Sequence, residues 1–233
     1  MTFQDISGKI VPRTKRGFLI YFCVLIALFF GFITTAWIIF PGTYSIIDSS
    51  LSTLGVMGDN PDGWYFFTLA IWSVAIGIIP LYFTIHDKLG REKPILGKVT
   101  LFFETITSIG LFMVGTFQEG GDLRRVHLYS AYVGFGGFFV SAIFGWILLG
   151  FKISTLNGPE KRAIAKLFSI QIAVLSFFAA LFITNIVLNG MGVIGYKGDP
   201  IGWFIGFPFT EWMLVFAIFI DKAILVLNIS KVY

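Results

Sequence analysis

A histidine and two carboxylates stand close together in the segment 117–127, where they could do acid–base or metal chemistry. Glu119 and Asp122 precede His127 by eight and five residues. A neutral imidazole can act as a general base or bind a metal, and a carboxylate can orient it. The sequence therefore predicts catalytic roles for His127 and Glu119, together with Glu211. It also makes His127, Glu119 and Asp122 candidate metal ligands. The alternative is a histidine that hydrogen-bonds a neighbouring helix.

A second set of polar residues could bind a lipid headgroup. A guanidinium pairs well with phosphate, although arginines at a membrane surface also extend to water without any ligand. The predicted headgroup contacts are Arg124, Arg125, Asp48 and Ser50. Ser49 or Ser50 with Asp48 and His127 could also form a nucleophile set, a weaker hypothesis because nothing in the sequence fixes their geometry.

Polar residues inside apolar segments form the third set. They are costly in a membrane and indicate function by default, with helix–helix hydrogen bonding as the alternative. Glu104, Gln171 and Asn185 are the predicted buried polar residues, and Glu211 lies in the last apolar segment. Asp221 and Lys222 are expected to form a pair at the membrane surface.

The composition shows which elements must position these residues. Of the 233 residues 56% are hydrophobic and 13% are charged, against about a quarter charged in soluble domains. Six apolar segments are long enough to cross a membrane. The sequence predicts an all-α, six-helix membrane bundle in a single domain, 1–233, with spans near 17–40, 64–85, 96–117, 126–149, 163–189 and 203–227.

Lysines and arginines predict the orientation of the bundle. Fourteen of the 17 basic residues fall at the two ends of the chain or in the segments after the second and fourth spans. The positive-inside rule then places both termini in the cytoplasm, with the protein in the cell membrane. His86 and His127 fall on opposite sides, so they cannot ligate one haem as a pair.

A stripe of small residues follows His127 along the fourth span. Its members recur every three or four residues on one helical face: Ser130, Ala131, Gly134, Gly137, Ser141 and Gly145. Small residues let another helix approach closely. We therefore expect His127 to face the interior, toward the helix that carries Glu211.

The first outer segment, 41–63, carries two structural expectations. Residues 44–54 could form a short amphipathic helix at the membrane surface. Asn60-Pro61 is typical of a helix start, with the asparagine capping free amides and the proline in the first turn. Asp199-Pro200 repeats this pattern before the last span, through either duplication or convergence.

Three motifs resemble the Frag/DRAM/Sfk family of six-span proteins and neighbouring prokaryotic six-span families. They are GTFQEGGDLRRVHLYSAYVGFGGFF, SIIDSSLSTLGVMGDNPDGWYF and the Thr-Glu-Trp at 210–212. The resemblance implies a six-span fold and a role in membrane lipid biology. The matching positions are Ser52, Leu54, Gly55, Pro61, Gln118, Glu119, His127 and Glu211.

Three functions remain open at this point. The first is binding or remodelling of lipid headgroups at the outer leaflet, by a polar site built from the first two outer loops and the tops of the fourth and sixth spans. The second is a non-catalytic subunit of a larger membrane complex, and the third is a small transporter. The expected partners are membrane lipids and other membrane subunits, not nucleic acid. No cofactor is expected beyond the candidate metal.

Overall fold

The structure, a computed structural model, describes residues 14–47, 49–190 and 207–231, without the side chains of residues 182, 185, 186, 189, 190, 207 and 231. Every regular element in this part of the chain is helical. Six of these helices are long and apolar enough to cross a membrane. The expectation of an all-helical chain with six helices long and apolar enough to cross a membrane is therefore confirmed for the described residues.

The helices follow the predicted spans closely. They are α2 (Lys15–Ile38), α3 (Trp64–Gly77) with α4 (Ile79–Ile85), α5 (Pro94–Thr116), α6 (Arg124–Thr155), α7 (Gly158–Gly190) and α9 (Phe207–Lys231). The main differences are longer helices around the connection between α6 and α7. The last predicted span begins in residues 203–206, which lie outside the described residues, and α9 continues to Lys231.

The helix ends have local causes. The side chain of Thr14 accepts a hydrogen bond from the backbone N–H of Gly17 at 3.0 Å and so caps the start of α2. Pro94 occupies the first turn of α5, where its missing N–H costs nothing. Between α6 and α7, Gly158 has φ of +67°, a conformation that glycine adopts without strain.

The second span is interrupted near its middle. Pro80 has no N–H to donate to the carbonyl four residues earlier, so the regular helix stops at Gly77 and restarts at Ile79. The hydroxyl of Tyr21, on α2, donates to the carbonyl of Gly77 at 2.7 Å. This bond ties the interruption to the first span. The span then ends in a π-helical turn, η2 (His86–Gly90).

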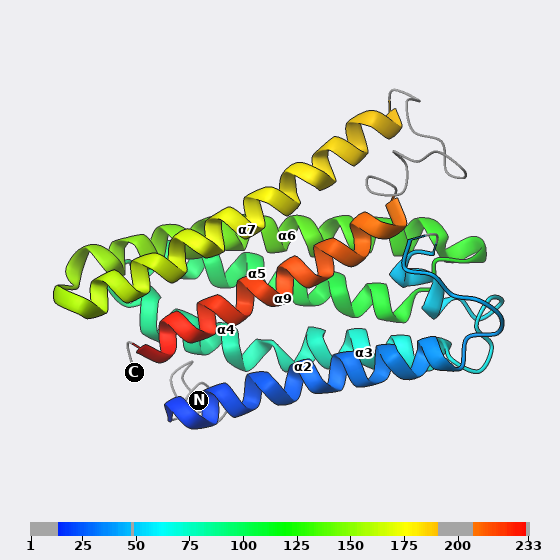
Figure 1. The fold of residues 1–233 in the computed structure, drawn as a ribbon, viewed down its shortest axis with the longest axis horizontal. Helices are drawn as coiled ribbons and strands as arrows, with labels where there is room; N and C mark the ends of the chain where they lie inside the picture. Colours follow the sequence, from blue (N-terminus) through cyan, green and yellow to red (C-terminus); the bar gives the residue numbers. More distant parts are fainter. Residues whose placement is uncertain (1–13, 48, 191–206, 232–233) are drawn as a thin grey trace.

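The helices run lengthwise beside one another, apart from the carboxyl half of α7, which diverges, and their described connections gather at two ends (Figure 1). We call one the basic end: it holds the start of α2, the end of α9 and the α6–α7 connection. At the opposite end, the acidic end, lie the long connection from α2 to α3, the connection from α5 to α6, and the start of α9.

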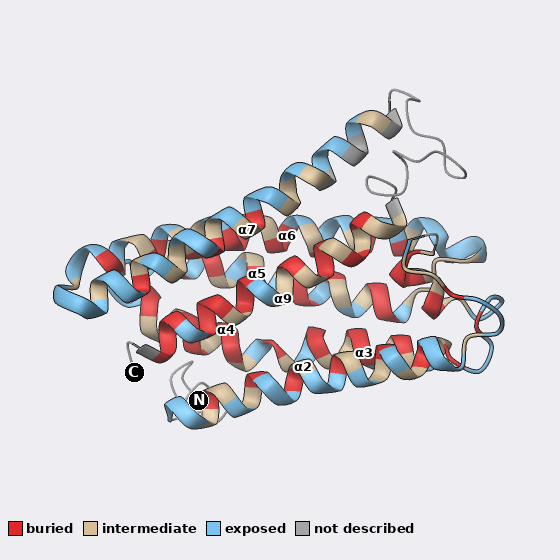
Figure 2. Cartoon of the chain, viewed as in Figure 1, coloured by how far each residue is buried: buried red, intermediate tan, exposed pale blue. Residues whose placement is uncertain are grey.

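Buried and exposed positions alternate along the helices (Figure 2), and many of the exposed residues are large and apolar. Ile95 is 82% exposed and Ile38 is 76% exposed. Such surfaces are costly in water and stable against lipid tails. The chain is thus compatible with a multi-pass integral membrane protein.

The small-residue stripe of α6 is buried, as expected, but it packs against α5. A Cβ added to Gly110 of α5 would overlap the backbone of Gly134, and one added to Gly137 would come within 2.9 Å of the hydroxyl of Thr107. His127 is buried, as expected, but the stripe packs mainly against α5 and not against the helix that carries Glu211, so that part of the expectation is wrong. Glycines on both α5 and α6 allow the close approach, and the pattern on α6 alone could not identify its partner.

The connection from α2 to α3 also differs from its prediction. Its described residues, which leave out position 48, form one short 3₁₀ helix, η1 (Leu51–Gly55), in place of the expected helix over 44–54. Asn60 does not cap α3: its amide nitrogen donates to the carbonyls of Ala36 at 3.1 Å and Leu54 at 2.9 Å. These bonds fix η1 against the end of α2, which is where the candidate site begins.

Candidate functional site

Three segments distant in sequence meet at the acidic end through Ser52 of η1. Its hydroxyl lies 2.6 Å from Oε2 of Glu119, in the α5–α6 connection, and 3.4 Å from Oε2 of Glu211, near the start of α9. The backbone N–H of Ser52 also points to Glu211 Oε2 at 3.5 Å. The two carboxylates therefore share one serine and lie within about 6 Å of each other, because each contacts the same oxygen atom.

Ser50 completes this arrangement, which we call the acidic-end group: Ser50, Ser52, Glu119 and Glu211. The Ser50 hydroxyl lies 3.3 Å from Glu119 Oε2 and 2.7 Å from the hydroxyl of Thr53. Both serines are buried, whereas the two glutamates are half-buried. The sequence predicted Ser50 as a headgroup contact, and that role stays a prediction; its contacts to Glu119 and Thr53 are what the structure adds.

Tyr44 and Trp212 form a hydrogen-bonded pair that holds the backbone of the acidic-end group at Ser50. The Tyr44 hydroxyl donates to the carbonyl of Ser50 at 2.7 Å and accepts from the indole N–H of Trp212 at 3.1 Å. Burial raises the pKa of the Tyr44 phenol, and the nearby carboxylates of Glu211 and Glu119 raise it further. The phenol therefore stays protonated and keeps donating to the backbone that carries Ser50.

A separate contact joins the two connections at this end. The side-chain oxygen of Gln118 accepts from the backbone N–H of Met57 at 3.2 Å. Gln118 precedes Glu119, and Met57 follows η1. The bond therefore holds the loop that supplies Glu119 beside the segment that supplies Ser52.

His127 is buried on α6, with 5% of its surface exposed, and its Nδ1 lies 2.6 Å from the carbonyl oxygen of Phe117. A carbonyl only accepts, so Nδ1 carries a proton, and in the neutral ring Nε2 is the acceptor. Phe117 lies two residues before Glu119. This contact gives His127 a positioning role for the loop that carries Glu119. A catalytic role for His127, Glu119 or Glu211 stays a prediction.

The other predicted residues of this end lie apart from these contacts. Arg124 and Arg125 are exposed in the first turn of α6, and Asp122 is exposed in η3 (Gly121–Leu123). Asp48 lies outside the described residues, so the nucleophile set that includes it stays a prediction. The described residues contain no group of three His, Cys, Asp or Glu that could hold a metal ion.

A second polar cluster, the mid-depth group, lies inside the bundle: Glu104, Gln171, Asp221 and Lys222. All four are at most 3% exposed. The sequence predicted Glu104 and Gln171 as buried, whereas the expectation that Asp221 and Lys222 form a surface pair is wrong. Nine residues separate Lys222 from the end of α9 at Lys231, about 14 Å along the helix. The side chain of Asn185 lies outside the described residues.

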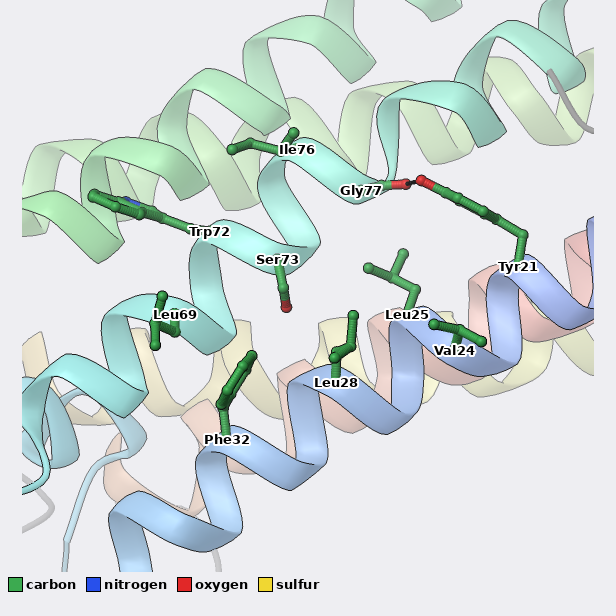
Figure 3. A pocket seen from close by; sticks show the side chains of 10 residues that line it. All are labelled: Tyr21, Val24, Leu25, Leu28, Phe32, Leu69, Trp72, Ser73, Ile76 and Gly77. Atoms are coloured by element: carbon green, nitrogen blue, oxygen red, sulfur yellow. Dashed lines mark hydrogen bonds between the residues drawn. The ribbon is translucent and has the colours of Figure 1, made fainter. Parts of the chain in front are cut away.

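An apolar groove of about 430 Å³ opens between α2 and α3 (Figure 3). Val24, Leu28 and Ile76 line it and are about half exposed. Its polar members are Ser73 and the Tyr21 hydroxyl, which is bonded to Gly77. The groove faces outward from the bundle, and it contains none of the predicted site residues.

Two features of the site were missed in the sequence. No contact between Tyr44 and Trp212 was predicted, although Trp212 lies in the Thr-Glu-Trp motif and aromatic side chains with polar tips usually find a hydrogen-bond partner when buried. Lys222 was counted with the surface lysines because it lies near the end of the chain. The apolar residues before Asp221 and after Lys222 were the available signal that this pair is buried.

Together these features define the class: an all-helical chain with six apolar helices, compatible with a multi-pass membrane protein, and with polar groups at one end and at mid-depth. Comparisons of the chain with protein families, with curated proteins and with solved structures find no match.

Proposed function

We propose that the acidic-end group binds the headgroup of a zwitterionic membrane lipid, with the ammonium between Glu119 and Glu211. The observation that carries the proposal is the sharing of Ser52 by two carboxylates from different segments. The Ser52 hydroxyl has one hydrogen, which serves the shorter contact to Glu119. Glu211 therefore faces mainly backbone N–H groups, those of Ser52 at 3.5 Å and of Leu51, and no cation among the described residues contacts it.

Two carboxylates held this close repel each other unless a cation or a proton lies between them. An ammonium group carries one positive charge and several N–H donors, which suit carboxylate and serine oxygens. Because both glutamates are half-buried, the group is open enough to receive such a ligand from the acidic end.

Arg124 and Arg125 are suited to the phosphate of the same headgroup. Both are exposed in the first turn of α6, just after the connection that carries Glu119. A guanidinium binds phosphate through paired hydrogen bonds, and free backbone N–H groups at a helix start also favour an anion. In a ligand that carries both groups, the phosphate would thus face the arginines and the ammonium would face the glutamates.

The proposal includes an orientation: the acidic end faces outward in the cell membrane and both termini are cytoplasmic. The gathering of lysines and arginines at the basic end supports it, since loops rich in these residues stay in the cytoplasm. The resemblance of the three motifs to the Frag/DRAM/Sfk family fits a lipid ligand. Ser52, Gln118, Glu119, His127 and Glu211 are motif positions, and all make contacts at this end.

Native mass spectrometry of the purified chain tests the proposal directly. The protein is mixed with equal amounts of phosphatidylethanolamine, phosphatidylcholine and phosphatidylglycerol. We expect phosphatidylethanolamine to be retained most, because its primary ammonium donates hydrogen bonds that a quaternary ammonium cannot. Glu119→Gln and Glu211→Gln should each lower this retention about tenfold, in line with loss of a charged hydrogen bond of about 1.5–3 kcal/mol.

Glu160→Gln is the matched control, because Glu160 is exposed at the basic end and contributes nothing to the acidic-end group. Arg125→Gln should lower the retention of all three phospholipids by the same factor, because all three carry a phosphate. Equal retention of the three lipids by the wild type, or glutamine variants that bind like Glu160→Gln, would overturn the proposal.

A second function, as a subunit of a larger membrane complex, is favoured by α7. Only 17% of the most apolar stretch of α7 is buried, against 61% for α9, and its carboxyl half leaves the other helices (Figure 1). Phe177 and Ile183 are about 60% exposed. Crosslinking through Phe177→Cys, in a Cys23→Ser background, would trap a protein partner; crosslinks to lipid alone would reject this function.

A further inference from the structure

The mid-depth group is far from both ends of its helices. Glu104 lies ten residues from the start of α5 at Pro94, about 15 Å along the helix, and twelve from its end at Thr116. Along α9, Glu211 of the acidic-end group lies ten residues from Asp221, also about 15 Å. The two polar groups share no residue.

One ion pair forms the centre of the mid-depth group. The Nζ of Lys222 lies 3.6 Å from Oε1 of Glu104 and above the rings of Phe138 and Tyr82, at 5.2 and 5.5 Å from their centres. Aromatic faces favour a cation. Glu104 and the two ring faces are thus the groups in contact with the Lys222 ammonium.

Asp221 is a second carboxylate in the same region. Its Oδ1 accepts from the side-chain N–H of Gln171 at 2.9 Å and from the indole N–H of Trp146 at 3.4 Å. Both donors are neutral. Asp221 thus has hydrogen bonds but no cation in direct contact among the described residues, and the group has two carboxylates for one ammonium.

Several oxygen atoms of the group have no partner. Among the described residues, Oε2 of Glu104, Oδ2 of Asp221 and Oε1 of Gln171 are buried without any hydrogen bond. Within the described part of the chain, the only other buried residue of the Asp, Glu, Lys, Arg or His types is His127, which lies at the acidic end. Neutral Tyr82 is the ionisable neighbour from α4, while Trp146 and Phe138 face the group from α6.

We propose that the mid-depth group binds one monovalent cation, a proton or Na⁺, at these free oxygens. Buried polar atoms in membrane proteins normally have partners, and a buried charge normally has a counter-charge. One added positive charge balances the second carboxylate and occupies free acceptors. Proton and sodium present the same charge to the same oxygens, and the experiment below separates them.

The full-length protein in lipid nanodiscs is the sample for the test. Infrared difference spectra detect a protonated carboxyl group directly, and the unfolding temperature is measured in sodium and in choline chloride at equal ionic strength. A bound proton gives a protonated-carboxyl band at neutral pH that Glu104→Gln or Asp221→Asn removes. A bound sodium ion gives a saturable rise of the unfolding temperature in sodium only.

Controls assign the signal to this group. Glu160→Gln should keep both signals, and Glu211→Gln should also keep them, because Glu211 belongs to the acidic-end group. The wild-type measurements stand even when a buried-site variant does not fold. The proposal fails if the wild type shows neither signal, or if the carboxyl band disappears in Glu211→Gln alone. Either result leaves lipid retention at the acidic end unaffected, so the two proposals fail separately.

Discussion

The hydroxyl of Ser52 lies 2.6 Å from Oε2 of Glu119, although 67 residues separate them in the chain. This contact joins the α2–α3 connection to the α5–α6 connection. The same serine also contacts Glu211 of α9. One small side chain thus links three of the spans at the acidic end, and its removal is the simplest perturbation of the group.

Ser52→Ala should lower the retention of phosphatidylethanolamine about tenfold and reduce stability. The substitution removes the hydroxyl from both carboxylates, and hydrogen bonds to charged groups contribute about 1.5–3 kcal/mol. Lipid retention in native mass spectrometry and the midpoint of thermal unfolding measure the two effects. Ser154→Ala is the control, because Ser154 is exposed and bonds only its own helix. Equal behaviour of the two variants would contradict the role of Ser52.

Tyr44→Phe should destabilise the protein by about 1–3 kcal/mol, because the Ser50 carbonyl and the Trp212 N–H both lose a buried partner. Unfolding in denaturant measures this loss. Tyr129→Phe, at a position 65% exposed, should change little. A loss no larger than that of Tyr129→Phe would show that the two bonds contribute nothing.

The same residue gives a pH dependence at alkaline pH. The folded-state pKa of Tyr44 lies above the ordinary value of 10.0. Its stabilising contribution is therefore complete below pH 10.0 and is lost as the pH rises through the folded-state pKa. Tyr44→Phe should lose less stability than the wild type between about pH 8 and about pH 11. An unchanged alkaline slope would contradict the raised pKa.

The sequence predicts the spans well because length and apolarity determine them. It also identifies Glu119 and Glu211, since carboxylates near span ends stand out against an apolar background. It could not place Ser52 against them: Ser45, Ser49, Ser50, Ser52 and Thr53 look alike in a connection without regular periodicity. The bonds of Asn60 to Ala36 and Leu54 hold η1 in a position where Ser52, like Ser50, is buried beside Glu119.

Lys222 shows a different limit of prediction from the sequence. The positive-inside rule counts lysines near span ends, and the predicted end at 227 placed Lys222 close to the surface. The end of α9 at Lys231 and the ion pair with Glu104 of α5 place it inside. Pairing between two helices is tertiary information, as it is for the glycines of α5 and α6, and one helix's pattern does not contain it.

The orientation can be tested by labelling introduced cysteines. In a Cys23→Ser background, Met57→Cys places a thiol in the exposed α2–α3 connection, and Glu160→Cys places one at the basic end. A membrane-impermeant maleimide should label the first in intact cells and the second only after permeabilisation. The reverse pattern would mean that the acidic end faces the cytoplasm.

Gly110→Ala should destabilise the bundle by about 1–3 kcal/mol, because the new methyl group meets the backbone of Gly134, which cannot rotate away. Gly136→Ala is the matched control, since a Cβ there has no atom within 4 Å. Thermal unfolding in the same detergent compares the two. Similar midpoints would mean that α5 and α6 do not approach as closely as their glycines allow.

The mid-depth ion pair predicts an asymmetry between its two partners. Lys222→Met leaves Glu104 and Asp221 buried without an ammonium and should cost about 3–5 kcal/mol. Glu104→Gln should cost less, because Asp221 remains to balance Lys222. The double variant should be more stable than Lys222→Met alone, with a coupling of about 1–3 kcal/mol in a double-mutant cycle of denaturant unfolding.

Asp87→Asn breaks the exposed pair with Arg91 and should have little effect, because solvent screens that pair. If Lys222→Met were as mild as Asp87→Asn, the lysine would not be balancing buried carboxylates.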